Sequence, residues 1–302
     1  MKLKRAVFAV CCFASVVNAQ IVAYAPSVAE LQALIDGGAS YIVVRNPTPG
    51  AEKVYETDKT IRLRDNLTIL CEPGVVIQAA AGAFKATGDV PDACLVAAVG
   101  VSSVAVRGCT FRMRKAEYTI ANGYPATEFR HAISLTGCTN VELTDVAVQR
   151  SGGDGVYVGP LVTAEGRKQC KNLVFRRLKA TDNYRQGVSL CSCDGMAIED
   201  SEFAGTKGTA PQAGIDIEPS SPLDVVRNIR VARCISYNNG GSAYMVNVTR
   251  LNATSAPVGI EFDDCKGMSI PAGHYLIRIE GMSWNRTDKP PGTVKWDGSV
   301  WP

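Results

Sequence analysis

After its first twenty residues, the sequence contains no apolar run approaching the roughly 20 residues of a membrane-spanning helix. It also lacks the paired Cys-x-x-Cys motifs that hold structural zinc. Helix-length apolar stripes are scarce, which excludes a stack of helical repeats. A membrane-spanning protein, a zinc module and a helical solenoid are therefore not expected.

An excess of positive charge is missing as well. The first nineteen residues hold three of the 32 basic residues and no acidic one, which leaves 29 basic against 29 acidic residues. A nucleic-acid-binding protein needs a basic excess on one face, so nucleic acid is not an expected partner. No coiled-coil segment is present, so the sequence specifies no oligomeric state.

The N-terminus has the features of a secretory signal peptide. Basic residues within positions 2–5 precede an apolar stretch from 6 to 17, and a cleavage site follows Ala19. An N-terminal membrane anchor is the alternative, but the apolar stretch is short for one. We therefore expect residues 1–19 to be removed and the mature protein to be secreted and extracellular.

A short helix is predicted next. Ser27-Val-Ala-Glu30 has the pattern of a capping box, and Gly37-Gly38 ends the helix. Four apolar residues share one helical face: Val28, Leu31, Leu34 and Ile35. We expect helix 27–38 to cover the open end of the β-rich body that follows.

From about residue 65 the sequence repeats a strand-and-turn pattern. In one element a polar turn precedes two apolar residues separated by one residue, as in Cys138-Thr-Asn-Val141-Glu-Leu143. Copies begin at Val101, Cys138, Cys170, Cys193 and Val226. A second element, a small residue followed by a short strand, recurs at Ala132, Gly155, Gly187, Gly214 and Ser242.

The regular return of both elements predicts a solenoid. Copies of the second element begin 23, 32, 27 and 28 residues apart, so each coil holds two or more short strands joined by turns. A β-sandwich is the alternative, but it does not predict one pattern in register five times. We predict an all-β, single-stranded right-handed parallel β-helix over residues 65–280, with an N-terminal cap at 20–64 and a C-terminal tail or cap at 281–302.

The cysteines fit the same alignment. Cys138, Cys170 and Cys193 share one position of successive coils, and Cys109, Cys234 and Cys265 share another. Because aliphatic residues fill these positions in other coils, the columns are expected to face inward. We expect buried, reduced thiols, with disulfides between stacked coils as the alternative. Possible glycosylation sites, for a host that glycosylates secreted proteins, are Asn66, Asn247, Asn252 and Asn285.

The sequence resembles the pectate-lyase-like superfamily of right-handed parallel β-helix proteins. The segments that carry the resemblance are the Ser27–Gly38 helix, Glu72-Pro-Gly-Val-Val-Ile77, Ser151-Gly-Gly-Asp-Gly-Val-Tyr-Val-Gly159, Thr181-Asp-Asn-Tyr-Arg-Gln-Gly187 and Ala213-Gly-Ile-Asp-Ile-Glu-Pro219. Members are mostly extracellular enzymes that act on polysaccharides, and others are phage tailspikes or adhesins. The resemblance implies the fold more specifically than the reaction.

Two activities of that superfamily lack their motifs here. The sequence has no Asn-Thr-Asp and no Ser/Gly-His-Gly, which the polygalacturonase pattern needs, and Asp263-Asp264 lies too near the end of the ladder to complete it. The Asp-Pro-His motif of mannuronan epimerases is also missing.

The strand that begins at Gly214 carries the best catalytic candidates. Ile215 and Ile217 should point into the core, so Asp216 and Glu218 should both face solvent, with Cα atoms roughly 6.5–7 Å apart. That spacing suits an acid and a base with a water between them. It also suits two ligands of Ca²⁺ and resembles the paired acids of calcium-using β-helix lyases, although no cofactor is the leading expectation.

Stacked coils should bring further polar residues to the same face. Asp154 is a candidate assisting acid, and the candidates for sugar binding are Arg185, Tyr157, Asn183, His131 and Tyr244. Each has a plainer interpretation: Asp154 and Asn183 as turn-stabilising residues, His131 as a hydrogen-bonded turn residue, and Arg185 as an ion-pair partner of Asp216.

These residues predict a polysaccharide or oligosaccharide partner. The leading hypothesis is a secreted glycoside hydrolase with Asp216 and Glu218 as the acid and base. A lyase or C5-epimerase on uronate polymers is the second hypothesis, in which Arg185 or Tyr157 takes the C5 proton. A non-catalytic carbohydrate-binding or surface protein is the third.

Overall fold

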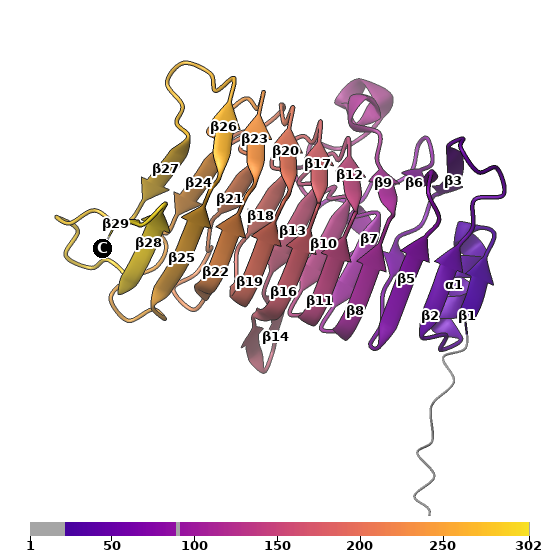
Figure 1. The fold of residues 1–302 in the computed structure, drawn as a ribbon, viewed down its shortest axis with the longest axis horizontal. Coiled ribbons are helices and arrows are strands. Elements are labelled where there is room, and N and C mark those ends of the chain that lie inside the picture. The colour runs from indigo at the N-terminus through magenta and orange to yellow at the C-terminus, as the bar shows by residue number, and fades with distance from the viewer. Residues whose placement is uncertain (1–21, 89–90, 302) are drawn as a thin grey trace, which may run out of the picture.

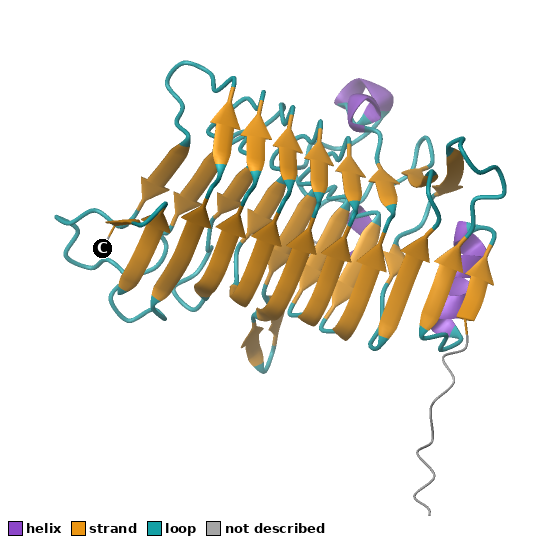
Figure 2. Cartoon of the chain, viewed as in Figure 1, coloured by secondary structure: helices purple, strands orange, loops and turns teal. Residues whose placement is uncertain are grey.

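The computed structural model describes residues 22–88 and 91–301, so the expected signal peptide at 1–19 lies outside the described residues. Three ladders of parallel strands run side by side along the long axis of the molecule (Figure 1). Figure 2 shows that strands make up most of the ordered structure and that helix is confined to α1 and a few short turns.

The longest ladder is an eleven-stranded sheet within the described residues. Its strands in spatial order are β1 (Val22–Ala25), β2 (Tyr41–Val44), β5 (Leu67–Cys71), β8 (Ser102–Arg107), β11 (Thr139–Thr144), β16 (Cys170–Arg176), β19 (Cys193–Glu199), β22 (Val226–Ala232), β25 (Val258–Asp263), β28 (Gly292–Trp296) and β29 (Ser299–Trp301). All neighbours pair in parallel except β28 and β29, which are antiparallel.

Two eight-stranded ladders complete the solenoid over the residues that the structure describes. We call one the β21 sheet: β4 (Ile61–Arg62), β7 (Val96–Val99), β10 (Ile133–Thr136), β13 (Val156–Gly159), β18 (Val188–Leu190), β21 (Ile215–Ile217), β24 (Tyr244–Asn247) and β27 (Ile277–Glu280). We call the other the β20 sheet: β3 (Lys53–Thr57), β6 (Val75–Ala79), β9 (Thr110–Arg112), β12 (Ala147–Gln149), β17 (Lys179–Thr181), β20 (Glu202–Ala204), β23 (Ile235–Tyr237) and β26 (Lys266–Met268). A hairpin of β14 (Leu161–Thr163) and β15 (Gly166–Lys168) projects from one turn.

This arrangement confirms the predicted right-handed parallel β-helix, because successive strands of each ladder come from successive coils. The ladders extend beyond the expected limits of the solenoid. β2, β3 and β4 already pair with β5, β6 and β7, upstream of residue 65. At the other end β28 pairs with β25 beyond residue 280. Both boundaries therefore fall inside the ladder.

The predicted N-terminal helix is present as α1 (Val28–Asp36). The Ser27 side chain accepts a hydrogen bond from the Glu30 amide at 3.2 Å, and Gly37 ends the helix. Val28, Leu31 and Ile35 are buried in the hydrophobic core cluster, so α1 covers the first coils as expected. No helix among the described residues is long and apolar enough to cross a membrane.

Inward-facing side chains stack in columns along the solenoid. Cys170 lies opposite Cys193 in the ladder, and Cys138 occupies the same position one coil earlier, with all three side chains fully buried. The inward columns predicted from the cysteine spacing are therefore confirmed.

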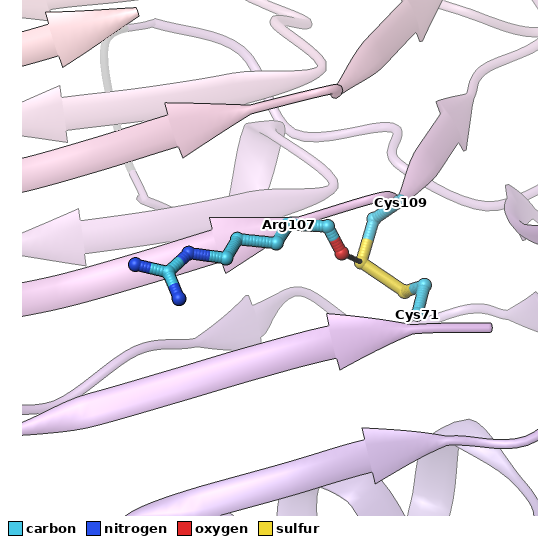
Figure 3. The surroundings of a disulfide bond; sticks show 3 residues. All are labelled: Cys71, Arg107 and Cys109. Carbon is cyan, nitrogen blue, oxygen red and sulfur yellow. Dashed lines mark hydrogen bonds between the residues drawn. A yellow bond between two sulfur atoms is a disulfide. The ribbon is translucent and has the colours of Figure 1, made fainter. Parts of the chain in front are cut away.

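One pair of cysteines is oxidised, which corrects the expectation of reduced thiols throughout. Cys71, at the end of β5, forms a disulfide with Cys109 of the next coil (Figure 3). Their Cα atoms are 4.9 Å apart, because stacked coils approach to the distance between neighbouring strands. No disulfide joins the remaining cysteines within the described residues: Cys94, Cys138, Cys170, Cys191, Cys193, Cys234 and Cys265.

A thiol count tests this pairing directly. Protein that lacks residues 1–19 and is denatured without reductant should titrate as seven free thiols, and as nine after reduction. A Cys71→Ser, Cys109→Ser variant should give seven under both conditions. Nine free thiols in the unreduced protein, or fewer than seven, would contradict the pairing.

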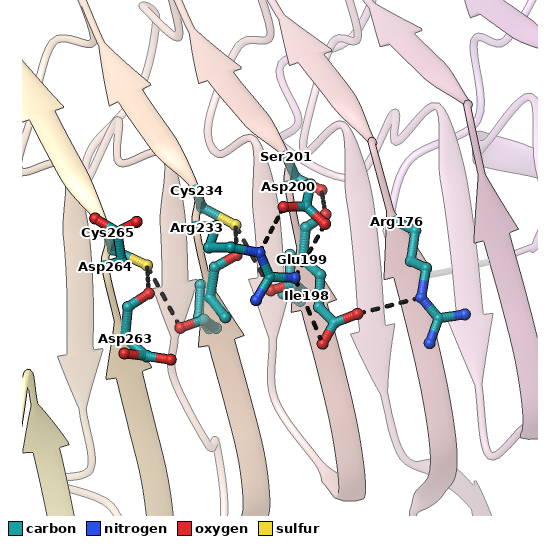
Figure 4. A network of polar contacts seen from close by, with 12 residues as sticks. Arg176, Ile198, Glu199, Asp200, Ser201, Arg233, Cys234, Asp263, Asp264 and Cys265 are labelled. Carbon is teal, nitrogen blue, oxygen red and sulfur yellow. Dashed lines mark hydrogen bonds and ion pairs between the residues drawn. The ribbon is translucent and has the colours of Figure 1, made fainter.

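A ladder of opposite charges marks one turn between the eleven-stranded sheet and the β20 sheet. Arg177 bonds both oxygens of Asp145 at 2.6 and 2.7 Å. Figure 4 shows the equivalent pair further along the solenoid, in which Arg233 bonds both oxygens of Asp200 at 2.7 and 3.0 Å. All four residues adopt left-handed backbone conformations with φ between 50° and 54°. Because these side chains are half exposed, each pair mainly fixes the turn register and contributes little stability.

Candidate functional site

The candidate site is built on the outer face of the β21 sheet. Asp216 lies opposite Ser189 of the preceding coil, and Ser189 lies opposite Tyr157, so the three side chains form one outward column. Ile215 and Ile217 are buried in the core, as the alternation predicted. Asp216 itself is 0 % exposed, so the expectation that both acids face solvent is correct only for Glu218, whose side chain is 33 % exposed.

Arg185 forms ion pairs with three acidic residues of the site. Its guanidinium lies 3.0 Å from Glu218, 3.7 Å from Asp154 and 3.3 Å from Glu128, and its charge also acts on Asp216. These partners come from three different coils or turns, and only stacking brings them together. Four carboxyl groups therefore surround one positive charge, and they raise the pKa of Arg185 further above its ordinary value despite its burial.

Asp216 and Glu218 are neighbouring carboxyl groups. Burial raises the pKa of Asp216 well above its usual range, repulsion from Glu218 raises it further, and Arg185 opposes the shift. One Asp216 oxygen accepts from the Gln186 side chain at 2.9 Å, and the other has no hydrogen-bond partner among the described residues. The surroundings of Asp216 therefore favour its protonated form.

Glu218 is held by two hydrogen bonds. One of its oxygens accepts from Arg185 at 3.0 Å and the other from the Asn247 amide at 3.1 Å. The two neighbouring acids therefore differ in their surroundings: Asp216 is buried, and Glu218 reaches the surface beside Arg185.

Asp154 and His131 form a second buried pair. The His131 Nδ1 lies 3.3 Å from an Asp154 carboxylate oxygen and accepts from the Asp154 backbone amide at 3.0 Å, so the ring is neutral and carries its proton on Nε2. Burial raises the pKa of Asp154 to about 7, opposed by Arg185. Burial and the nearby Arg185 lower the pKa of His131 to about 3. Its ring stacks on Tyr157, with centroids 4.9 Å apart.

Tyr244, predicted to bind sugar, lies elsewhere. It pairs with Ile215 in the ladder, so its ring points into the core, where it packs on Phe262 and its hydroxyl donates to the Lys266 carbonyl. The residue opposite Asp216 is Met245. The alignment taken from Ser242 was one residue out of register, and the side chain consequently changes face.

Asn183 is also removed from the open face. It is 0 % exposed, and its side-chain oxygen accepts from the Ser151 amide at 3.2 Å. Asn239 makes the same contact with Thr206 two coils on, at 2.9 Å. Asn183 therefore belongs to an internal column that satisfies turn backbone, which is the plainer of the two predicted roles.

Three residues of the site were not among the candidates. Glu128 lies in the long insertion between β9 and β10, outside the repeat, so no register placed it beside Arg185. Asn247 was noted only as a glycosylation acceptor. Cys191 follows β18, and its buried thiol has a pKa raised to about 12, chiefly by burial. Leu190 lies opposite Ile217 in the ladder, so Cys191 occupies the position in its coil that Glu218 occupies in the next. This equivalence in the repeat was the sequence signal that could have identified Cys191 as part of the site.

The site does not suit a bound Ca²⁺. No group of three or more potential metal-ligating side chains occurs in the described ranges. A cation held by Asp216 and Glu218 would also have to share Glu218 with the guanidinium of Arg185 at 3.0 Å, and the two positive charges would repel. The arrangement suits proton transfer instead, since it holds two buried acids with raised pKa values, Asp154 and Asp216, near Glu218.

The fold and site define the class: the chain is a right-handed parallel β-helix protein with an acid cluster on the outer face of one sheet. Endo-xylogalacturonan hydrolase from Aspergillus tubingensis superposes with a TM-score of 0.53 at 13% identity, covering 92% of this chain and 82% of that one. A 1,3-α-1,4-β-D-galactose-4-sulfate-3,6-anhydro-D-galactose-2-sulfate 4 galactohydrolase gives 0.51 at 12% identity, covering 78% and 52%. Likeness at this identity concerns the fold.

Comparison by sequence matches a smaller part of the chain. The chain is 36% identical over 116 residues to the uncharacterized protein YclG of Bacillus subtilis. The match covers 36% of this chain and 20% of YclG, so the chain spans about a fifth of that relative. No protein-family model matches.

Proposed function

We propose that the protein is a secreted glycoside hydrolase that cuts a polysaccharide at the acid cluster around Arg185. The observation that carries the proposal is the proximity of a buried acid with a raised pKa, Asp216, to a second acid, Glu218, that reaches the surface beside Arg185. Glycoside hydrolysis needs one carboxyl group that gives a proton and another that takes one up.

In the proposed reaction, Asp216 gives its proton to the glycosidic oxygen as the bond to the anomeric carbon breaks. Water adds to that carbon, and Glu218 takes the proton that the water loses. Asp154, with a pKa of about 7, can exchange protons with the site at neutral pH. Asp216 is buried in the structure, so side chains around it have to move when the sugar binds.

Two further observations support a hydrolase. Two solved structures that superpose with TM-scores above 0.5 are hydrolases by name, an endo-xylogalacturonan hydrolase and a galactohydrolase. The only strong cation of the cluster, Arg185, is engaged by carboxyl groups of the protein itself. A lyase or C5-epimerase would need it free to neutralise a uronate carboxylate. The secretory leader expected at 1–19 would place the enzyme outside the cell, where polysaccharides are found.

The test is the release of new chain ends from a panel of neutral, uronate and sulfated polysaccharides. Reducing ends and the ultraviolet absorbance of unsaturated uronates are read together. We expect reducing ends without that absorbance, and a loss of about 10²–10⁴-fold with Asp216→Asn or Glu218→Gln. Glu202→Gln, at a similarly exposed position on β20, is the matched control and should keep full activity.

The outcomes separate the hypotheses. Unsaturated products would replace the hydrolase by a lyase. Exchange of the C5 hydrogen with solvent, without new ends, would indicate an epimerase. Binding without any turnover, unchanged by both variants, would leave a carbohydrate-binding protein.

A further inference from the structure

A second concave feature lies beside the acid cluster. The insertion between β9 and β10 contains two short turns, η2 (Lys115–Glu117) and η3 (Ile120–Asn122), which stand above the ends of the β20 sheet (Figures 1 and 2). Between this insertion and the turns after β17 and β20 is a cleft of about 400 Å³. It has the size of a site for a small ligand or one sugar unit.

The walls of the cleft are aromatic and held in place. Tyr118 and Tyr124 meet edge to face with centroids 5.0 Å apart, and the buried guanidinium of Arg130 lies over both rings at 5.4 and 5.3 Å. Tyr184, on the opposite side, is fixed by backbone hydrogen bonds to Gly153 and Thr209. Rigid tyrosines of this kind stack on the apolar faces of sugar rings.

The charged groups that line the cleft are cationic. Lys115 and Lys207 line it, and no Asp or Glu does. Lys115 forms an ion pair with Asp182 outside the lining, and Lys207 is exposed and donates to the Asn238 side chain at 3.1 Å. A neutral ligand gives no reason for two amines here, whereas a carboxylate or sulfate ester on a sugar does.

The cleft and the acid cluster are joined through the backbone. Thr127 and Tyr184 line the cleft, and the residues that follow them, Glu128 and Arg185, belong to the cluster. Gly152, also in the lining, is two residues before Asp154; a Cβ there would come within 2.4 Å of the Tyr118 ring. The carboxyl groups of the cluster outnumber its single guanidinium, whereas the charged side chains that line the neighbouring cleft are cationic and attract anions.

We infer that this cleft is a subsite for an anionic sugar unit, with Lys207 and Lys115 contacting the negative group and Tyr184 contacting the ring. The inference rests on the proposed function and deepens it. The anionic unit binds beside the scissile bond, and a unit without a charged group occupies the acid cluster. The substrate is therefore a polysaccharide that carries uronate or sulfate groups on some of its units.

Direct binding tests this without requiring turnover. The mature protein carrying Asp216→Asn and Glu218→Gln is titrated in a calorimeter with neutral galactan, galacturonan and sulfated galactan oligosaccharides. We expect an anionic oligosaccharide to bind, and Lys207→Gln to raise its Kd about tenfold. Tyr184→Leu should weaken binding of the same oligosaccharide. Lys179→Gln, at an exposed lysine of β17 outside the cleft, is the control and should leave the Kd unchanged.

Each outcome decides the inference. Binding of galacturonan alone or of sulfated galactan alone supports it and names the anionic group. Equal binding of neutral oligosaccharides, an unchanged Kd in Lys207→Gln, or no binding by any of the three overturns it. If anionic oligosaccharides bind in the cleft but the protein cuts no polysaccharide, the proposed hydrolase function is wrong. The inferred binding site for an anionic sugar unit then still stands.

Discussion

Replacement of Arg185 by methionine is expected to lower the free energy of unfolding by about 3–5 kcal/mol near neutral pH, and to abolish activity. The guanidinium is 17 % exposed and is the shared partner of Glu128, Asp154 and Glu218. Its removal leaves carboxyl groups that are buried or half-buried without their positive partner. The loss of stability should shrink as the pH falls, because the remaining carboxyl groups then take up protons.

Denaturant unfolding at about pH 5 and about pH 7.5 measures this effect. Arg233→Met removes an arginine from the exposed charge ladder and serves as the control, with a small effect at both pH values. An Arg185→Met protein as stable as the parent near neutral pH would show that the cluster does not depend on its cation.

The second large effect concerns pH and the buried pair of Asp154 and His131. The pKa of Asp154 is raised in the folded protein to about 7 from 3.8. Its contribution to stability is therefore fully present below pH 3.8 and is lost as the pH rises through 7, a change of about 4 kcal/mol. Asp154→Asn, which cannot ionise, should gain stability relative to the parent over that interval.

His131 acts in the opposite direction. Its pKa is lowered in the folded protein to about 3 from 6.5, so its contribution is present above pH 6.5 and is lost as the pH falls toward 3. His131→Gln should therefore gain stability relative to the parent as the pH falls from 6.5 to about 4, by about 3 kcal/mol. In the parent the two contributions nearly cancel over this interval.

Unfolding free energies of the parent and the two variants, measured at intervals from about pH 4 to pH 8, show the effect as opposite slopes. The difference from the parent removes the contribution of Asp216, which is common to all three proteins. Parallel curves for the two variants would mean that Asp154 and His131 do not titrate as the buried pair that the structure describes.

The pattern of the sequence was sufficient for the fold. The return of Gly-Ile-Asp-Ile217 and its relatives at coil intervals placed Ile215 and Ile217 in the core, and the Cys138, Cys170 and Cys193 column confirmed the register. Alternation along a strand has a period of two and repeats in every coil, so it is readable from one sequence. The capping box at Ser27 was readable for the same local reason.

The site was only partly predictable, because it depends on contacts between coils. Asp216 was correctly placed on the outer face, but its burial comes from its neighbours on other coils and turns, such as Ser189 and Gln186. Glu128 comes from an insertion without repeat register. At Tyr244 the glycine that marks the strand start elsewhere is replaced by Ala243, and an assignment one residue off changed the face.

The Cys71–Cys109 disulfide is expected to make the two ends of the solenoid differ in their resistance to unfolding. In a solenoid each coil contacts only its neighbours, so the terminal coils can unfold before the central ones. The disulfide links the second and third coils covalently, and α1 covers the end next to them. At the opposite end Trp296 packs on Phe262, and no disulfide links the described residues of the C-terminal coils. Unfolding should therefore begin at the C-terminal coils and proceed toward the N-terminus. The acid cluster, midway along the solenoid, should unfold before the coils that the disulfide links.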